Sequence, residues 1–330
     1  MKTVILLLLQ GVDVMQSKDM AIGYAIGYND GLGQGGSEYD DSKWMRPSDW
    51  PEMSDPEDNQ VIMLITTWWN DSSDETFDIY AHNGGYTSGN FDGTTSVKID
   101  WGDGTNDKID LPINSESINV NHTFANGTIL ENGAIAFVVT ITLPENAYLN
   151  FENLNCYPLE IFIGSNVKFH KDIIKNEYLL EHIKLFGWQP NEKDNFYTSN
   201  GILSGNYNLQ CVDTTIPLTY IPKSAFSNCF NLKEIDLSQC TSIEESGLST
   251  TALTTVTSSK LIRLASMALG YCRQLKYVNT PALIGVQSGA FAQCFNIENI
   301  THSEDWVYES GSFRQLFKWF DNPEKPRIKY

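Results

Sequence analysis

A frame that recurs about every 22 residues limits the folds open to this 330-residue chain more than any other feature. Each copy reads Leu or Ile, two variable residues, then Ile or Val. The copies begin at Leu209, Leu232, Leu253, Leu275 and Ile297, which lie 23, 21, 22 and 22 residues apart, and Leu180 begins an earlier candidate. So short a period leaves no room for a helix pair. It suits one strand with one short helix or turn in each repeat.

A second shared element precedes three of these frames. It places an Ala, then Phe or Leu, then Cys three residues later, as in Ala225, Phe226 and Cys229. The equivalent residues are Ala268, Leu269, Cys272, Ala290, Phe291 and Cys294. This spacing puts the apolar residues on one face of a helical turn, and the following frame begins a strand. The copy at 246–253 is degenerate and lacks the cysteine.

Together the two elements resemble the BspA-type, or Treponema pallidum-type, leucine-rich repeats, in which Ile-Pro-x-x-Ala-Phe-x-x-Cys-x-x-Leu-x-x-Ile recurs. Ile221 and Pro222 supply the start of that pattern. The resemblance implies a leucine-rich-repeat solenoid, which we expect over residues 146–305, with the clearest repeats at 205–301. Such arrays bind partners over a broad exposed surface rather than in a deep pocket.

The six cysteines fit packing better than chemistry. They are Cys156, Cys211, Cys229, Cys240, Cys272 and Cys294. None forms a Cys-x-x-Cys pair, and the five histidines make no metal-ligand spacing with them, so no zinc site is expected. Cys229, Cys272 and Cys294 fall where the repeat needs a small buried residue. A disulfide between Cys272 and Cys294 is the alternative in an oxidising environment.

Aromatic residues dominate the segment 306–330, which breaks the repeat pattern. They include Trp306, Phe313, Phe317, Trp319 and Phe320, and 313–320 has helical spacing. Because a repeat array needs its open end covered, we expect a C-terminal cap. An aromatic contact for a partner subunit or a glycan is the alternative.

Residues 61–145 have a different character, with short apolar or alternating runs of strand length. The runs are 61–68, 77–80, 97–101 and 136–143. Turn signals separate them, among them Gly102-Asp103-Gly104 and Asn126-Gly127. Several short strands at such spacing predict an immunoglobulin-like β-sandwich.

The turn in this region also carries a resemblance. The segment Ile99–Thr105, followed by Val120–Phe124 and the strand 137–143, resembles the PKD-type immunoglobulin-like fold. The glycines permit a tight turn, and Asp103 can accept hydrogen bonds from backbone amides within it. We expect His122 to cap the turn or pack beside it. The segment between the two parts of the motif, 106–117, is longer than the family pattern.

Residues 1–60 form an N-terminal arm with two open interpretations. Met1–Leu9 begins like a secretory signal, yet the apolar run is short and no small-x-small cleavage site follows. We therefore expect an uncleaved segment that pairs as a strand within an assembly. The glycine-rich stretch and the duplicated Ala-Ile-Gly-Tyr at 21–28 suit a docking strand or a flexible connector.

The end of the arm, Trp44–Trp50, contains Arg-Pro-Ser-Asp-Trp. It resembles the Arg-Pro-x-Asp-Trp segment that leads into such domains in some tailed-phage virion proteins. Two tryptophans that hold a linker against the sandwich explain the same residues equally well.

The charge balance argues against nucleic-acid partners. Lys and Arg total 22 against 41 Asp and Glu, a formal charge of −19, and no basic cluster occurs. A field of this sign repels phosphate backbones. No apolar run is long enough to span a membrane.

The usual motifs of catalysis are missing from the sequence. There is no Gly-x-Ser-x-Gly elbow, phosphate-binding glycine loop or His-Glu-x-x-His helix, and no particular carboxylate pair is indicated. Asp100, Asp103 and Asp107 do not follow the EF-hand spacing. We assign no catalytic, cofactor-binding or metal-binding residues and no cofactor, and expect a protein that is not an enzyme.

The expected architecture is mainly β with short helices: an arm, an Ig-like sandwich and a repeat solenoid. It favours a virion structural protein of a tailed phage, such as a head fibre, tail fibre or decoration protein. The arm would bind other subunits, and the repeats would bind a host protein or glycan. The alternative is a secreted BspA-like bacterial cell-surface adhesin. A homo-oligomer fits either function.

Overall fold

The structure is a computed structural model that describes residues 43–67, 76–77, 80–83, 96–110, 120–144, 147–150, 157–167, 179–189, 201, 203–309 and 311–312. The chain divides into two compact units, Met1–Tyr39 and Asp40–Tyr330, and every described residue belongs to the second. The expectations for residues 1–42, for Cys156 and for the cap beyond residue 312 lie outside the described residues.

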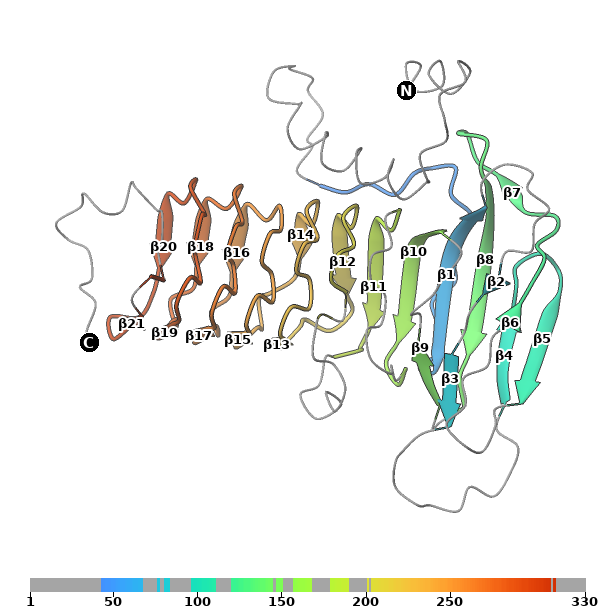
Figure 1. The fold of residues 1–330 in the computed structure, drawn as a ribbon, viewed down its shortest axis with the longest axis horizontal. Helices are drawn as coiled ribbons and strands as arrows, with labels where there is room; N and C mark the ends of the chain where they lie inside the picture. Colours follow the sequence, from blue (N-terminus) through green and yellow to red (C-terminus); the bar gives the residue numbers. More distant parts are fainter. Residues whose placement is uncertain are drawn as a thin grey trace. The chain divides into compact units, whose positions relative to one another are not determined.

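The described chain is built from strands and turns (Figure 1). Strand β1 (Gln60–Thr67) lies between β8 (Ile135–Thr142) and β10 (Tyr157–Gly164), antiparallel to both. Beyond β8 the sheet continues through β4 (Ser96–Asp100) to β5 (Asn106–Asp110), and β7 (Thr128–Ile129) also pairs with β8. Two short ladders join β2 (Thr76–Phe77) to β6 (Val120–Asn121) and β3 (Tyr80–Asn83) to β9 (Ala147–Asn150).

From β10 onward the same sheet becomes parallel. β11 (His182–Phe186), β12 (Cys211–Thr214) and β14 (Glu234–Ile235) follow β10 in order. A second parallel sheet joins β16 (Thr255–Thr257), β18 (Tyr277–Asn279) and β20 (Asn299–Thr301). A third column contains β13 (Tyr220–Ile221), β15 (Ser242–Ile243), β17 (Arg263–Leu264), β19 (Gly285–Val286) and β21 (Val307–Tyr308). Each repeat therefore contributes two strands, one to the first or second sheet and one to the third column, as β16 and β17 do (Figure 1).

The sheet crosses the predicted boundary between the sandwich and the repeats. Because β1 pairs directly with β10, the antiparallel strands and the first parallel strands form one continuous sheet. The described residues do not show a second packed sheet of an Ig-like sandwich. The domain limits at 61–145 and 146–305 stay predictions.

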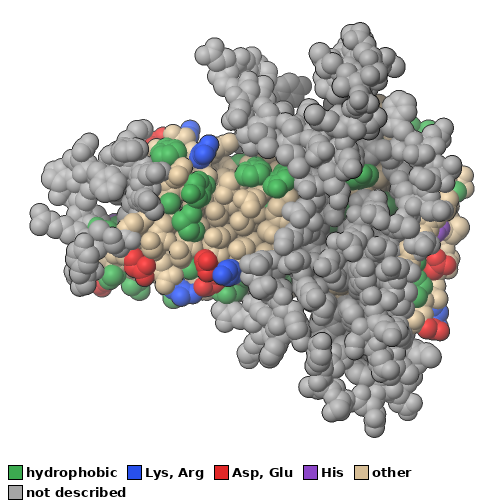
Figure 2. Space-filling model, in the orientation of Figure 1, with side chains coloured by type: hydrophobic (Ala, Val, Ile, Leu, Met, Phe, Trp, Pro, Cys, Tyr) green, Lys and Arg blue, Asp and Glu red, His purple; other side chains and the backbone are tan. Residues whose placement is uncertain are grey.

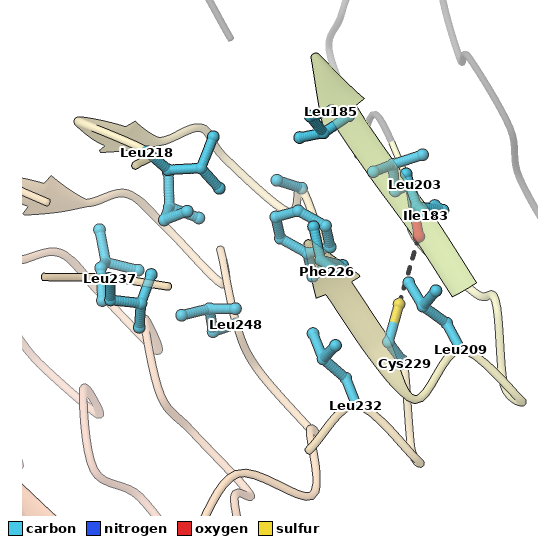
Figure 3. Packing of buried hydrophobic residues seen from close by; sticks show 14 of the residues in the cluster. Ile183, Leu185, Leu203, Leu209, Leu218, Phe226, Cys229, Leu232, Leu237 and Leu248 are labelled. Atoms are coloured by element: carbon cyan, nitrogen blue, oxygen red, sulfur yellow. Dashed lines mark hydrogen bonds between the residues drawn. The ribbon is translucent and has the colours of Figure 1, made fainter. Parts of the chain in front are cut away.

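One apolar core runs through both regions. Its buried side chains extend from Val61 in β1 to Trp306 before β21. Figure 3 shows the part around Phe226, Cys229 and Leu232, whose side chains fill the space between the strand columns. The interior positions of the repeat frame are buried because each strand alternates an inward apolar residue with an outward one.

The short helix expected in each repeat is wrong for the described residues, which contain no helix. Two consecutive turns replace it. The Ala225 amide donates to the Pro222 carbonyl (3.3 Å), and the Cys229 amide to the Phe226 carbonyl (3.2 Å). The intervening Phe226 amide donates instead to Gly247 of the next repeat (2.9 Å). A helix would keep all of these amides within its own segment, whereas these turns also hold neighbouring repeats together.

Left-handed backbone at two positions of each turn segment explains why no helix forms. The first position is occupied by Gly201, Ser224, Ser246, Met267, Gly289 and Gly311, and the second by Gly205, Asn228, Thr250, Tyr271 and Gln293. Their φ angles lie between 52° and 86°. A residue in this region cannot continue a right-handed helix, so helical spacing of the apolar residues was misleading here.

Candidate functional site

The outward face of the parallel strands carries rows of side chains that the strand register aligns. On β10, β11, β12 and β14 the register aligns Glu160, His182, Cys211 and Glu234 in one row across the sheet. The residue that follows a row residue on its strand points into the core, as Ile161 does after Glu160 and Ile183 after His182. The outward row is therefore rich in ionisable groups.

A segment from before β1 covers this row. We name residues 43–53 the tryptophan segment. The Trp44 ring stacks on the His182 ring, with centroids 4.2 Å apart, and the Trp44 amide donates to Glu234 Oε1 (2.6 Å). The Trp44 indole Nε1 donates to Glu181 Oε2 (3.3 Å). Burial raises the pKa of Glu181, which the hydrogen bond from Trp44 partly offsets.

Arg46 fixes the tryptophan segment to the sheet by an ion pair. Its Nε lies 2.8 Å from Glu160 Oε2, and the Glu160 side chain is fully buried. The rest of the guanidinium donates to the carbonyls of Trp50 and Pro51. Arg46 thus joins the turn of its own segment to a carboxylate on β10, because its planar fork offers several donors at once.

Trp50 anchors the other end of the tryptophan segment. It is buried in a small cluster with Leu64 of β1 and Ala136 of β8, on the side of the sheet opposite the main core. This confirms that Trp44 and Trp50 hold the linker against the sheet. That packing accounts for the Arg-Pro-Ser-Asp-Trp residues without a virion partner.

The second parallel sheet presents a different outward face. Its strands expose a polar row of Thr255, Tyr277 and Asn299, which the register places side by side. Tyr277 is 42% exposed, and its hydroxyl donates to Glu298 Oε2 (2.9 Å), which raises the pKa of Tyr277. No contact from the tryptophan segment reaches this row among the described residues.

Few charges lie on this part of the molecule despite the net charge of the chain. Figure 2 shows the described repeat surface as mostly tan, with scattered hydrophobic side chains and charged ones near its edges. The exposed row of Thr255, Tyr277 and Asn299 on β16, β18 and β20 offers hydroxyl, aromatic and amide groups. Such groups form hydrogen bonds and stacking contacts without a large desolvation cost for charges.

The predicted core role of the repeat cysteines is confirmed. Cys229, Cys272 and Cys294 are fully buried and free. Each thiol donates to a carbonyl of the preceding repeat, as Cys229 Sγ does to Leu203 (3.2 Å; Figure 3). The degenerate copy places Thr251 there, and its hydroxyl donates to Leu248 (3.1 Å). The column thus selects small residues that donate one hydrogen bond.

Burial also makes these three thiols, and that of Cys240, poor nucleophiles. It raises the pKa of Cys229 and of Cys240 to about 12, and raises that of Cys272 and Cys294 as well. Only the thiolate is an effective nucleophile. These four side chains therefore serve packing rather than covalent chemistry.

The Asp103 turn has the geometry expected from its motif. Asp103 Oδ1 accepts hydrogen bonds from the amide and hydroxyl of Thr105, and Oδ2 from the Ala125 amide. His122 Nε2 lies 2.9 Å from Asp103 Oδ2, and its ring stacks on Trp101 with centroids 4.2 Å apart. His122 thus both caps the turn and packs beside it.

The other two aspartates near this turn are also engaged by protein donors. Asp107 accepts from the Trp101 indole (2.8 Å), and Asp100 accepts from the Gly102 amide (3.0 Å). Gly102 has a φ of 74°, and a Cβ there would lie 2.4 Å from the Val138 carbonyl oxygen, so the turn requires glycine. These carboxylates shape the turn.

Sequence reasoning missed one group of side chains that the fold brings together. His182, Cys211 and Asp213 place one ligand atom each within 4.8 Å of one another. They come from two parallel strands. Cys211 and Asp213 lie 29 and 31 positions after His182 in the sequence, so no local spacing could reveal the group. The signal that could have found them is the strand register.

The repeats match a known family. Residues 198–315, about a third of the chain, match the model of the BspA type leucine rich repeat region in six copies. The chain therefore carries a BspA-type leucine-rich-repeat region, as the motif resemblance implied. No curated protein matches the chain.

Two solved structures are similar over part of their length. One is a leucine rich cell surface protein from Faecalibacterium prausnitzii A2-165, with 19% identity over 48% of this chain and a TM-score of 0.35. The other is a leucine-rich repeat protein from Eubacterium ventriosum ATCC 27560, with 18% identity over 46% of this chain and a TM-score of 0.26. The chain spans 51% of the first and 35% of the second.

Among the described residues, no helix is long and apolar enough to cross a membrane.

Proposed function

We propose that this chain is a non-enzymatic bacterial cell-surface protein that binds a host protein or glycan through the outward face of its repeats. The observation that carries the proposal is the exposed polar row on β16, β18 and β20, which no described residue of the tryptophan segment contacts, next to a row that this segment covers. The BspA-type repeat region supports a recognition role, since repeat arrays present extended binding surfaces.

The antiparallel part, in this proposal, acts as a spacer that carries the repeats. The sheet is continuous through β1 and β10, so the spacer and the first repeat strands share backbone hydrogen bonds. A stiff connection of this kind keeps the binding face oriented while many copies act together. Several weak contacts on one surface then give firm attachment.

The virion function has less support. The comparisons contain no virion protein. The Arg-Pro-Ser-Asp-Trp segment, which suggested that function, has a structural explanation in the ion pair of Arg46 and the packing of Trp50. The bacterial surface function therefore replaces it as the proposal.

Mass spectrometry of the natural protein tests this proposal. We expect peptides of the chain in the envelope fraction of the source bacterium, with a mature N-terminus near residues 15–20. Intact Met1 peptides in purified virions would contradict the proposal and support a virion structural protein. Hydrolysis of a glycan by the purified chain would contradict the non-enzymatic part.

A further inference from the structure

The ligand group beneath the tryptophan segment carries an inference about metal binding. His182 Nε2 lies 3.1 Å from Asp213 Oδ2, and Cys211 Sγ lies 3.6 Å from Asp213 Oδ1. Glu234 on the next strand brings its Oε2 to 3.9 Å from Cys211 Sγ. We infer that His182, Cys211 and Asp213 form a binding site for a zinc ion, which Glu234 can complete as a fourth ligand after its side chain moves.

The distances between these atoms suit a tetrahedral zinc ion. With the usual Zn–N, Zn–O and Zn–S bond lengths, two nitrogen or oxygen ligands lie about 3.3 Å apart, and sulfur lies about 3.6 Å from either. The distances from His182 to Asp213 Oδ2 and from Cys211 to Asp213 Oδ1 are close to these values, and one ligand atom from each of the three residues lies within 4.8 Å of the others. Glu234 is outside the group of ligand atoms that lie within 4.8 Å of one another, so its carboxylate must move toward His182 and Asp213 to become the fourth ligand.

The orientation of the His182 ring is a second, independent observation. Its Nδ1 lies 2.7 Å from Glu160 Oε1, and Glu160 also accepts a hydrogen bond from Arg46. With the Nδ1 hydrogen donated to that buried carboxylate, the Nε2 lone pair points toward Asp213. Zinc-bound histidines are oriented by a carboxylate in this way, which fixes the tautomer and makes the nitrogen a better ligand.

The site has a path to solvent and a ligand set that selects the metal. The Asp213 side chain is 58% exposed, whereas His182 and Cys211 are nearly buried. Sulfur and imidazole ligands favour zinc over calcium or magnesium. On binding, the metal takes the Cys211 thiolate and the thiol proton passes to solvent, so the affinity rises with pH.

Zinc here would attach the tryptophan segment more firmly. Glu234 accepts the Trp44 amide, and Trp44 stacks on His182, so two of the four ligands also contact that segment. A ligand that binds only the folded chain stabilises it by mass action. Zinc is therefore expected to raise the Tm of the whole chain.

Metal titration of the purified full chain tests the inference. The chain, freed of metal with a chelator, is titrated with Zn²⁺ against a chromophoric chelator and, separately, with Co²⁺ in the spectrophotometer. We expect one Zn²⁺ per chain, and for Co²⁺ a sulfur-to-metal charge-transfer band with visible bands of tetrahedral geometry. A ring protonated on both nitrogens, held between Glu160 and Asp213, would explain the contacts without metal. In that case neither signal appears and the inference fails.

Matched variants locate the bound metal. Cys211→Ser should abolish the charge-transfer band, and Asp213→Asn, at a side chain that is 58% exposed, should abolish one-to-one binding. Glu160→Gln should weaken zinc binding about 10- to 100-fold. The controls Cys240→Ala and Asp236→Asn should bind like the parent chain. Unchanged binding in folded Asp213→Asn, or loss in Asp236→Asn, would place the metal elsewhere and overturn the inference.

Discussion

The Asp103 carboxylate connects three parts of the chain through one side chain. It accepts hydrogen bonds from Thr105, His122 and Ala125, and the side chain is 1% exposed. Burial by itself raises the pKa of Asp103, but these hydrogen bonds outweigh it and lower the pKa from 3.8 to about 2. The charged form is therefore favoured in the folded protein.

Asp103→Asn should lower the free energy of unfolding at neutral pH by about 2 kcal/mol, because hydrogen bonds to a charged acceptor are lost or weakened. The contribution of a carboxylate with a lowered pKa is complete above its unfolded pKa and is lost as the pH falls through the folded one. The deficit should thus shrink between pH 4 and pH 2. Urea unfolding of both proteins across this range measures it.

The control for this experiment is Asp110→Asn, at an exposed residue of β5. It should change the free energy of unfolding by less than about 0.5 kcal/mol. A pH-independent deficit in Asp103→Asn would contradict the charged role of this carboxylate.

The three thiols of the repeat column and the buried thiol of Cys240 should be inert while the chain is folded. Iodoacetamide labelling at pH 8, mapped by mass spectrometry, should leave Cys229, Cys240, Cys272 and Cys294 unmodified, because they are buried and their pKa values are raised. Addition of denaturant should expose all four. Rapid modification of Cys229 in the native protein would contradict the packing described above.

At the scale of single elements, the turn segments determine the repeat more than the strands do. The strands of the third column contain only two residues each, as in β13 and β15. Each turn segment, by contrast, bonds both to itself and to the next repeat. The left-handed residues make this possible, and several of them are not glycine.

Thr250 is the least suitable of these residues for its backbone conformation. It is β-branched and has a φ of 63°. Thr250→Asn, which introduces the residue found at the equivalent Asn228, should raise the free energy of unfolding by about 0.5–1 kcal/mol. Thermal unfolding of the two proteins measures the change. The same substitution at Thr255, on a strand, should give no gain, and a lower Tm for Thr250→Asn would contradict the strain.

The sequence predicted the repeats better than the elements within them. The spacing of the Leu-x-x-Ile frames and of Cys229, Cys272 and Cys294 located the repeats and the buried column, because both depend on periodicity alone. The helix was wrong because seven of the eleven left-handed residues named above are not glycine, so the sequence carries no glycine signal at those positions. The pairing of β1 with β10 and the approach of His182 to Cys211 depend on the register between strands far apart in the sequence, which one sequence does not reveal.

At the scale of the whole molecule, the tryptophan segment divides the outward face of the repeats into a covered and an open part. The covered part contains a buried carboxylate, Glu160, between Arg46 and His182. The open part contains the polar row of β16, β18 and β20. The segment thus joins the antiparallel region to the repeats, and in the proposed function it leaves the open part for the partner.

Arg46→Ala should be strongly destabilising, by about 3 kcal/mol, because it leaves Glu160 buried without its cation. Denaturant unfolding measures the loss. Lys223→Ala is the matched control: it removes a cation from a pair with Glu245 in which both side chains are about half exposed, and such pairs contribute at most about 1 kcal/mol. Equal effects of the two substitutions would show that the tryptophan segment is not firmly held.

The measurement that tests the central claim most directly is binding by the parent chain and by variants of the open face. Once a protein or glycan ligand is found on arrays of host surface molecules, Tyr277→Ala and Asn299→Ala should each weaken binding about tenfold or more, as central contact residues do. Tyr271→Ala should not, since this tyrosine is similarly exposed, at 38%, but lies in a turn and not on the strands of the face. Unchanged affinity in both face variants, with loss in Tyr271→Ala, would contradict the account.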